Sequence, residues 1–384
     1  MKYYFDHAAT TPIYPEALKI LHDNYQLNWC NPNSNNRKSK LIKSQIEECR
    51  KYFLNYFKAN SDDHFLFTSS ATESNNTIIQ KINLADDSIV LYTSSDHPSV
   101  VQPLLYKAKN KKIKLIEYRI LKNGLIDEVY FEQLIKNYSD KIKLVIFTEI
   151  NNQSGVIQNI EKLAILIKEH TNAFIHIDAV QSFTKIKAFN IEYIDSVTIS
   201  AHKIGGPCGI AGLLIKKKSF STLLGPLLFG GGQENNLRSG TEAFPLIFSF
   251  RKATELAIFN LKEDFHNLNS LISNLKENLK IIIPKATFPF VNHSPYILCF
   301  LIPNISSDII LRHLEEFQII ISSTSACSSK IKNKSEVLTA LNIPDHLQKN
   351  VLRISFSKNT SFESLEYLLK KFQQVWKDLN YLIK

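Results

Sequence analysis

The sequence predicts an α/β fold: a mostly parallel sheet covered by helices, followed by a smaller α+β domain. Between Phe65 and Ile215, short apolar runs rich in β-branched and aromatic residues alternate with helix-like segments. Most of these runs are apolar on both faces, as strands are when helices cover both sides of a parallel sheet. The chain has 384 residues, which is too many for one simple core, so two domains are expected.

Seven segments are candidate strands of the large sheet. In chain order they are Phe65–Thr68, Ile89–Tyr92, Lys114–Tyr118, Leu144–Thr148, Phe174–Asp178, Val197–Ser200 and Gly212–Ile215. Ile160–His170 is one of the helical stretches between them. Sheets of this kind bind ligands beyond the carboxyl ends of their strands. The residues that end these strands are therefore the first candidates for a functional site.

The pattern of elements changes after about residue 250. A long helical stretch covers Leu261–Leu279, and strand candidates follow at Ile297–Leu301, Ile319–Ile321 and Leu352–Phe356. From Phe362 to Leu379, apolar residues recur at three- and four-residue steps, which predicts an amphipathic helix. We expect three parts: an N-terminal segment 1–15 that packs with the small domain, a large domain 16–250 and a small domain 251–384.

Composition and charge exclude several classes of protein. The apolar fraction is 44% and the charged fraction 21%, which is typical of soluble globular chains. No stretch approaches the ~20 apolar residues of a membrane-spanning helix, and we expect no secretory signal. Lys+Arg total 46 and Asp+Glu 36, a net charge of +10. The lysines are spread out with no aromatic residues among them, so no direct nucleic-acid binding is expected.

The five cysteines are Cys30, Cys49, Cys208, Cys299 and Cys327, an odd number without a Cys-x-x-Cys pair. This argues against a disulfide framework or a structural zinc site and indicates a reducing, cytoplasmic setting. Glycine is more informative, because ten of the 11 glycines lie between Gly155 and Gly240. Glycine is used where a backbone turns tightly or approaches a ligand. No G-x-G-x-x-G motif follows a strand, and no P-loop is present, so a nucleotide site of either kind is not supported.

Two strand ends and one loop carry groups suited to chemistry. One strand ends in Asp178 and the next leads to Lys203, 25 residues later, so both can meet at one edge of the sheet. A structural ion pair is the alternative for these two residues. Thr68–Ser74 follows a strand and opens a helix whose N-terminus suits a phosphate, or is simply capped. An amine, an acid and a phosphate cradle together describe a pyridoxal phosphate (PLP) site.

The motifs in this order closely resemble those of the cysteine desulfurases of the class V aminotransferase group, which are fold-type I PLP enzymes. The resemblance runs from Phe5 nearly to the C-terminus. Its motifs are Phe5–Pro12, Ala71–Asn75, Ser95–His97, Asn151–Asn152, His176–Gln181, Ser200–Lys203, Gly230–Glu234, Arg238–Thr241, Ser325–Ser329 and Arg353–Phe356. The stretch from Ser328 to Ser335 resembles the longer cysteine-bearing loop of the iron–sulfur-supplying branch.

The resemblance implies a role for each matching residue. Lys203 would bind the cofactor covalently, Asp178 would pair with its ring nitrogen, and His97 would stack on the ring and assist proton transfer. Asn152 and Gln181 would lie around the phenolic oxygen, with Asn152 also near the substrate. The phosphate would be held by Ala71, Thr72, Ser200 and His202, with Thr241 reaching the phosphate of a second subunit in a homodimer. Arg353 would bind the substrate carboxylate, and Cys327 would attack the substrate sulfur.

These roles predict an enzyme that converts L-cysteine to L-alanine and leaves a persulfide on Cys327. The sulfur would pass to an iron–sulfur scaffold or a tRNA-thiolation relay protein. Two alternatives stay open: another class V enzyme, such as a selenocysteine lyase or a transaminase, and a binding protein on an inactive PLP scaffold. A surface role for Arg353 and a capping role for His97 are also open. The chain departs from the family pattern at Arg37, Gln153, Cys208, Asn235–Asn236 and Thr324.

Overall fold

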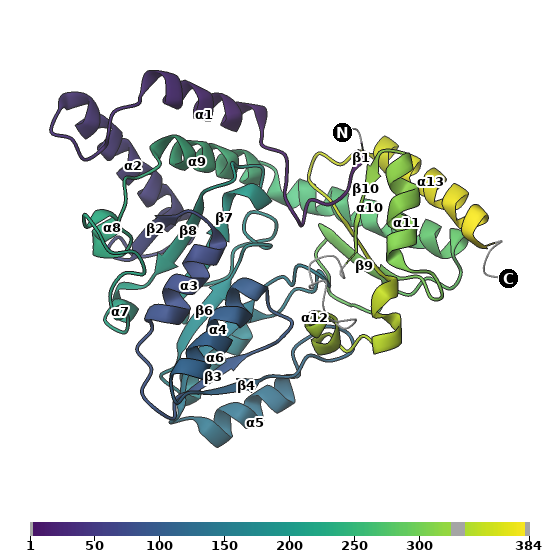
Figure 1. Ribbon diagram of the computed structural model, residues 1–384, viewed down its shortest axis with the longest axis horizontal. Coiled ribbons are helices and arrows are strands. Elements are labelled where there is room, and N and C mark those ends of the chain that lie inside the picture. The colour runs from purple at the N-terminus through teal and green to yellow at the C-terminus, as the bar shows by residue number, and fades with distance from the viewer. Residues whose placement is uncertain (1–2, 324–334, 381–384) are drawn as a thin grey trace.

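A seven-stranded sheet forms the centre of the large domain in the computed structural model, which describes residues 3–323 and 335–380 (Figure 1). The order along the sheet is β2 (His64–Thr68), β8 (Ala211–Ile215), β7 (Ser196–Ser200), β6 (Phe174–Asp178), β5 (Ile142–Thr148), β3 (Ile89–Tyr92) and β4 (Lys114–Glu117). Five neighbouring strands, from β7 to β4, run parallel, and β8 is antiparallel to both β2 and β7. The predicted, mostly parallel sheet is confirmed.

Each face of the sheet is covered by a different set of helices. Successive residues of a strand point to opposite faces, so each strand contributes to the core on both sides. Val145 and Phe147 of β5 belong to the core formed with α2 (Arg37–Tyr56), α5 (Glu128–Tyr138), α6 (Ile160–His170) and α9 (Phe244–Ile258). Leu144 and Ile146 belong to the core formed with α3 (Ala71–Lys81) and α4 (Pro98–Asn110). This double covering explains why the strands are apolar on both faces.

The remaining helices of this half are α1 (Pro15–Leu27), the short 3₁₀ turn η1 (Ala201–Lys203), α7 (Lys217–Phe220) and α8 (Gln233–Asn236). Helix α1 packs against α9. Residue 250, where the sequence predicts a domain boundary, lies inside α9, whose Ala253 and Ala257 still belong to the core of the large sheet.

The C-terminal half has its own sheet and core. Strand β12 (Val351–Ser355) lies between β11 (Ser322–Ser323) and β9 (Ile297–Leu301), antiparallel to both. The helices are α10 (Leu261–Ile282), α11 (Ser307–Glu316), α12 (Glu336–Ala340), the 3₁₀ turn η2 (Asp345–Asn350) and α13 (Phe362–Asn380). Leu275 of α10, Phe300 of β9 and Phe372 of α13 are completely buried together. The predicted helix and strand segments are confirmed here, with shifts of a few residues at their ends.

The N-terminal segment joins the two halves. Strand β1 (Tyr3–Tyr4) pairs in parallel with β10 (Ile319–Ile320), and Asp6 forms a bridge with Ser355 of β12. From there the chain crosses to α1, which lies at the top of the large domain in Figure 1, as the purple trace shows. The crossing residues therefore lie between the small domain and the end of the large sheet. None of the helices in the described ranges is both long and apolar enough to cross a membrane.

Candidate active site

The predicted site residues gather where the parallel strands of the large sheet end. Strands β5, β6 and β7 run side by side and end at Thr148, Asp178 and Ser200. Helix α3 begins just beyond the end of β2, and α4 begins just beyond the end of β3. The carboxyl edge therefore combines strand ends with two helix N-termini, as the sequence predicts.

Asp178 is held as a hydrogen-bond acceptor at this edge. Its carboxylate, 4% exposed, accepts from Asn75 Nδ2 at 3.0 Å and from the backbone N–H of Val180 at 3.0 Å. Asn75 Oδ1 lies 3.0 Å from His176 Nε2. Burial lowers the pKa of His176 to about 3, so its imidazole is neutral and its Nε2–H can donate to Asn75. The side chain of Asn75 thus fixes the orientation of the acid.

His97 caps the helix that follows it and is linked to the same network. Its Nδ1 accepts from the backbone N–H of Ser99 at 3.1 Å and lies 2.8 Å from Ser99 Oγ. Ser99 Oγ in turn accepts from Asn75 Nδ2 at 2.9 Å. Burial lowers the pKa of His97, although the negative charge of Asp178 opposes this effect. The ring is therefore neutral, and because Nδ1 accepts, the proton resides on Nε2.

The N-terminus of α3 forms the predicted phosphate cradle. Ser70 is the N-cap, and its Oγ accepts from the backbone N–H of Glu73 at 3.2 Å. The preceding N–H groups, those of Ala71 and Thr72, have no partner within the helix. Thr72 and His97 also line a cleft of about 790 Å³ between α3 and α4. An anion placed at this helix end would be favoured by the free N–H groups and the helix dipole.

Lys203 reaches the same edge from η1, directly after β7. Its Nζ donates to the carbonyl oxygens of Ala8 at 2.8 Å and Ala9 at 2.6 Å, so the N-terminal segment lies against this amine. The chain then turns at Gly205, whose φ is +85°. A Cβ at this position would lie 2.5 Å from the ring of Tyr14, so only glycine allows this turn.

Arg353 approaches the edge from the small domain. Its guanidinium is 5% exposed, and donates from Nη1 to the carbonyl oxygen of Asn152 at 2.9 Å and from Nη2 to Asp6 Oδ1 at 2.7 Å. Its Nε is buried and has no hydrogen-bond partner among the described residues. Such burial rules out the open alternative of an ordinary surface arginine. Gln181 lies in the turn after β6, where Nε2 donates to the carbonyl oxygen of Ala8 at 2.8 Å.

The remaining predicted residues differ in where they lie. Ser200 is buried at the end of β7, and His202 Nδ1 lies 3.2 Å from Thr10 Oγ1. Burial lowers the pKa of His202 to about 4, helped by the charges of Lys203 and Lys185. Thr241 is exposed and lines a small cleft with Thr68 and Ser69 at the end of β2.

Cys327 lies outside the described residues. The chain leads toward it from β11, where Ser322 is in register with Arg353 of the neighbouring strand. The other cysteines are described: Cys49 and Cys299 are buried, Cys30 is partly buried, and Cys208 is exposed. Burial raises the pKa of the Cys49 thiol to about 11 and that of Cys299 to about 12, which makes both poor nucleophiles.

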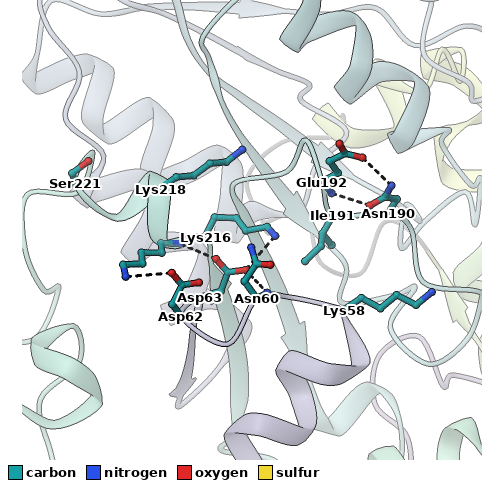
Figure 2. A pocket seen from close by; sticks show the side chains of 11 residues that line it. Lys58, Asn60, Asp62, Asp63, Asn190, Ile191, Glu192, Lys216, Lys218 and Ser221 are labelled. Atoms are coloured by element: carbon teal, nitrogen blue, oxygen red, sulfur yellow. Dashed lines mark hydrogen bonds and ion pairs between the residues drawn. The ribbon is translucent and has the colours of Figure 1, made fainter.

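A second cavity, of about 760 Å³, lies at the opposite end of the large sheet and contains none of the predicted site residues (Figure 2). It is lined by the segment before β2, the segment before β7 and the chain after β8. Its acids form ion pairs with neighbouring lysines. Lys216 pairs with Asp63, both of which Figure 2 labels, and Lys217 pairs with Asp62, each pair at 3.2 Å. This cavity is remote from the chemistry of the carboxyl edge.

Sequence reasoning assigned no role to four residues that orient the predicted groups: Asp6, Asn75, Ser99 and Lys185. Asp6 and Asn75 stand inside quoted motifs, so their positions were visible in the sequence but their contacts were not. Asn75 is completely buried in α3, and a buried polar side chain requires a hydrogen-bond partner. Its burial, which the structure shows, is therefore the signal that it has a role. Lys185 stands four residues after Gln181, and its Nζ donates to Gln181 Oε1 at 3.0 Å.

The comparisons with known proteins point in one direction. The family model of aminotransferase class-V matches residues 3–368. A NifS/IcsS protein homolog of Lactobacillus delbrueckii subsp. bulgaricus is 31% identical over 97% of both chains. The cysteine desulfurase IscS of Dictyoglomus turgidum is 30% identical over 97% of this chain and 94% of its own. The X-ray structure of a NifS-like protein from Rickettsia africae superposes with a TM-score of 0.85 at 28% identity, covering 98% and 99% of the two chains.

Proposed function

The chain belongs to the aminotransferase class-V family, and on this premise we propose that it is a PLP-dependent cysteine desulfurase that converts L-cysteine to L-alanine. One observation carries the proposal: Lys203, Asp178 and His97 converge at one edge of the sheet, beside the free N-terminus of α3 and a buried arginine. A transaminase or a selenocysteine lyase would share most of this arrangement. Cys327 favours a desulfurase over a transaminase, because sulfur transfer uses a thiol and transamination does not.

The residues present fit PLP. Asp178 offers acceptor oxygens of the kind that a protonated ring nitrogen needs, and two N–H donors hold its carboxylate in place. Ala71 and Thr72 would hold the phosphate through their backbone N–H groups, supported by Ser200 and His202. When bound, this cofactor supplies a ring that takes up the electron pair released from the substrate.

The protein groups bind the substrate and move its protons. Arg353 would hold the carboxylate of L-cysteine, and its unpartnered Nε is a donor that such a ligand can use. Lys203 would bind the cofactor, and its amine would then exchange protons at the substrate α-carbon. His97 is neutral and carries its proton on Nε2, so near neutral pH its Nε2–H would donate a hydrogen bond to the bound cofactor or substrate and assist proton transfer by orienting it.

Cys327 would attack the substrate sulfur, forming a persulfide while the carbon–sulfur bond breaks. The sulfur would then pass to an acceptor, an iron–sulfur scaffold or a tRNA-thiolation relay protein, in a cytoplasmic setting. Cys49 and Cys299 are unsuited to this task, because burial keeps them protonated. Exposed Cys208 is the only rival with free access among the described cysteines.

The test is sulfide and alanine release from cysteine, with and without a thiol reductant. We expect Cys327→Ser to abolish sulfide release yet keep the visible absorption band of the bound cofactor. Cys208→Ser and Cys299→Ser should behave as the parent does. Mass spectrometry should find an added mass of about 32 Da, one sulfur, on the Cys327 peptide. Undiminished turnover in Cys327→Ser, or the added sulfur on Cys208, would refute the assignment.

The binding-protein alternative is tested by the same preparations. The purified parent should be yellow, and borohydride should bleach it and fix the cofactor to the Lys203 peptide. Lys203→Ala should lose this covalent attachment. A colourless parent that stays colourless after addition of PLP would favour an inactive scaffold.

A further inference from the structure

Lys185 is a buried cation for which the proposed reaction has no use. It follows the turn after β6 and is 6% exposed. In the part of the chain that the structure describes, it forms no ion pair with a carboxylate. Its Nζ donates to Gln181 Oε1 at 3.0 Å and lies 5.7 Å from the centre of the Tyr296 ring.

Such a lysine is costly to keep. Burial, together with the positive charges of Lys203 and Arg353, lowers the pKa of Lys185 to about 7. An ammonium without a carboxylate partner costs several kcal/mol to bury, so a hydrophobic side chain of similar length would fold at least as well. Perturbed groups of this kind cluster at functional sites.

The partner of Lys185 occupies a central place in the site. The side-chain amide of Gln181 is engaged at both ends: Oε1 accepts from Lys185, and Nε2 donates to the carbonyl oxygen of Ala8 at 2.8 Å. The ammonium can only donate and the carbonyl can only accept, so both neighbours impose the same orientation on the amide. A flip of the amide would set a donor against a donor and an acceptor against an acceptor.

Gln181 and Lys203 share one hydrogen-bond acceptor, the carbonyl oxygen of Ala8. Lys203 Nζ also donates to the carbonyl oxygen of Ala8, at 2.8 Å. The amide nitrogen of Gln181 has two N–H groups and uses one at Ala8, which leaves the second for a group bound by Lys203. The connection Lys185–Gln181–Ala8–Lys203 therefore links the buried cation to the amine that would carry the cofactor.

We propose that Lys185 is a positioning residue: it holds Oε1 of Gln181 so that Nε2 donates toward the oxygen substituent of a PLP ring attached at Lys203. This inference rests on the proposed function, since it assumes that PLP binds there. Lys185 does not touch the reacting atoms, and its effect passes through Gln181.

The experiment is a double-mutant cycle in the full chain. PLP is titrated into cofactor-free parent, Lys185→Met, Gln181→Ala and the double variant, and binding is followed by the visible band. We expect Lys185→Met to raise the dissociation constant by about tenfold, which corresponds to about 1.4 kcal/mol. If Lys185 acts through Gln181, the double variant should bind as weakly as Gln181→Ala and no more weakly.

Three further variants make the outcome decisive. Lys185→Arg retains a cationic donor and should recover most of the binding. Lys187→Met removes an exposed lysine two positions away and should match the parent. If Lys185→Met does not fold, Lys185→Gln, which is uncharged and polar, takes its place in the cycle.

The unfolding temperature separates positioning from a structural role. We expect Lys185→Met to unfold at the same temperature as the parent or higher, because a buried charge has been removed. Parent-like PLP binding by Lys185→Met, or a double variant in which the two losses multiply, would overturn the inference. If the parent itself gives no visible band with PLP, the proposed function fails instead.

Discussion

At the scale of single residues, the site depends on neutral acids and bases as much as on charges. Glu149 follows the last residue of β5 and is 6% exposed, and burial raises the pKa of its carboxyl to about 8. Asp96, beside His97, has its pKa raised to about 7 by burial, and it accepts from Thr148 Oγ1 at 2.7 Å. Both acids pack beneath the carboxyl edge without a cationic partner in the described residues.

Glu149 gives a pH-dependent prediction. Its pKa is 4.5 unfolded and about 8 folded, so between these values the folded state binds more protons. This contribution to stability is complete below pH 4.5 and is lost as the pH rises to about 8. Glu149→Gln keeps the neutral form at every pH. We expect the parent to lose stability relative to Glu149→Gln by up to about 1.4 kcal/mol per pH unit across this window.

The measurement is urea unfolding of both proteins at several values of pH from about 5 to about 9, because the folded and unfolded pKa values of Glu149 span most of this range. Glu169→Gln, at an exposed residue of α6, is the control and should leave the pH profile unchanged. Parallel profiles for the parent and Glu149→Gln would contradict a buried, neutral Glu149.

The sequence predicts which residues gather at the carboxyl edge, but not the side chains that orient them. Asp178 and Lys203 follow from strand ends and spacing, because these are local patterns. The bond from Asn75 to Asp178 joins residues 103 positions apart, and that from Arg353 to Asp6 joins residues 347 positions apart. Side-chain partners at such separations depend on the packing of whole elements. The sequence allows two interpretations of His97, a cofactor contact and a helix cap, and its contact with the backbone of Ser99 confirms the cap.

At the scale of elements, buried ion pairs fix the ends of the large sheet. Asp63 precedes β2 and Lys216 follows β8, and their side chains are 3% and 10% exposed. Asp63 also accepts from the backbone N–H groups of Asn60 and Lys217, each at 2.9 Å. This pair therefore holds two antiparallel neighbours together at the edge remote from the site (Figure 2).

Removing the charge of Asp63 should destabilise the protein strongly. Asp63→Asn leaves the ammonium of Lys216 buried without a counterion, and we expect a loss of about 3 kcal/mol in the free energy of unfolding. Asp62→Asn is the matched control, because the Asp62–Lys217 pair next to it is more than half exposed on both sides. That change should cost less than about 1 kcal/mol. Equal losses in urea unfolding would contradict this account.

The turn at α8 is held in an unusual backbone conformation. Glu234, Asn235 and Asn236 have φ values of +50°, +57° and +63°. Two contacts of the Glu234 carboxylate offset this strain. It pairs with buried Arg50 at 2.6 Å and accepts a hydrogen bond from the backbone N–H of Phe67 at 3.3 Å. The turn leads to Arg238, whose Nε donates to Glu73 at 2.9 Å at the start of α3. The strained turn thus contacts the start of α3, where the phosphate is predicted to bind.

Asn236 tests this strain. Asparagine tolerates the left-handed region better than alanine, and glycine tolerates it without steric cost. We expect Asn236→Ala to lower the free energy of unfolding by about 1 kcal/mol, and Asn236→Gly to change it by less than about 0.5 kcal/mol. Urea unfolding of the two variants measures the difference. A parent-like Asn236→Ala would show that this backbone is not strained.

At the scale of the whole molecule, both halves contribute to one site. The large sheet supplies Asp178 and Lys203, and the small domain supplies Arg353. The N-terminal segment contacts both halves, through Asp6 on one side and Ala8 on the other. The sequence predicted that this segment packs with the small domain. Its hydrogen bonds to Gln181 and Lys203 were not predicted, because they depend on the path by which the chain crosses from β1 to α1.

The face that carries Thr241 is the expected dimer interface. Large apolar side chains are exposed on the loops around it: Trp29 is 76%, Phe229 78% and Leu228 42% exposed. These loops meet, since Asn33 donates to Glu242 at 2.7 Å and the backbone N–H of Ser239 donates to the carbonyl oxygen of Leu228 at 3.2 Å. Exposed apolar clusters of this kind mark protein–protein contacts. The resemblance to the family implies that, in such a dimer, Thr241 of each subunit would reach the phosphate of the other.

We therefore predict a homodimer that Phe229→Asp or Trp29→Asp weakens by at least about tenfold, because buried aromatic anchors dominate interface energies. Phe259→Asp is the matched control: its ring is 82% exposed, but it lies at the end of α9, away from these loops, and should leave the dimer intact. Sedimentation at micromolar concentration measures the assembly, and the visible band of bound PLP measures the site. If Thr241 completes the cradle of the second subunit, the two loop variants should lose cofactor as they dissociate. A parent that is monomeric and fully active at micromolar concentration would contradict the prediction, since a complete site would then need no second subunit.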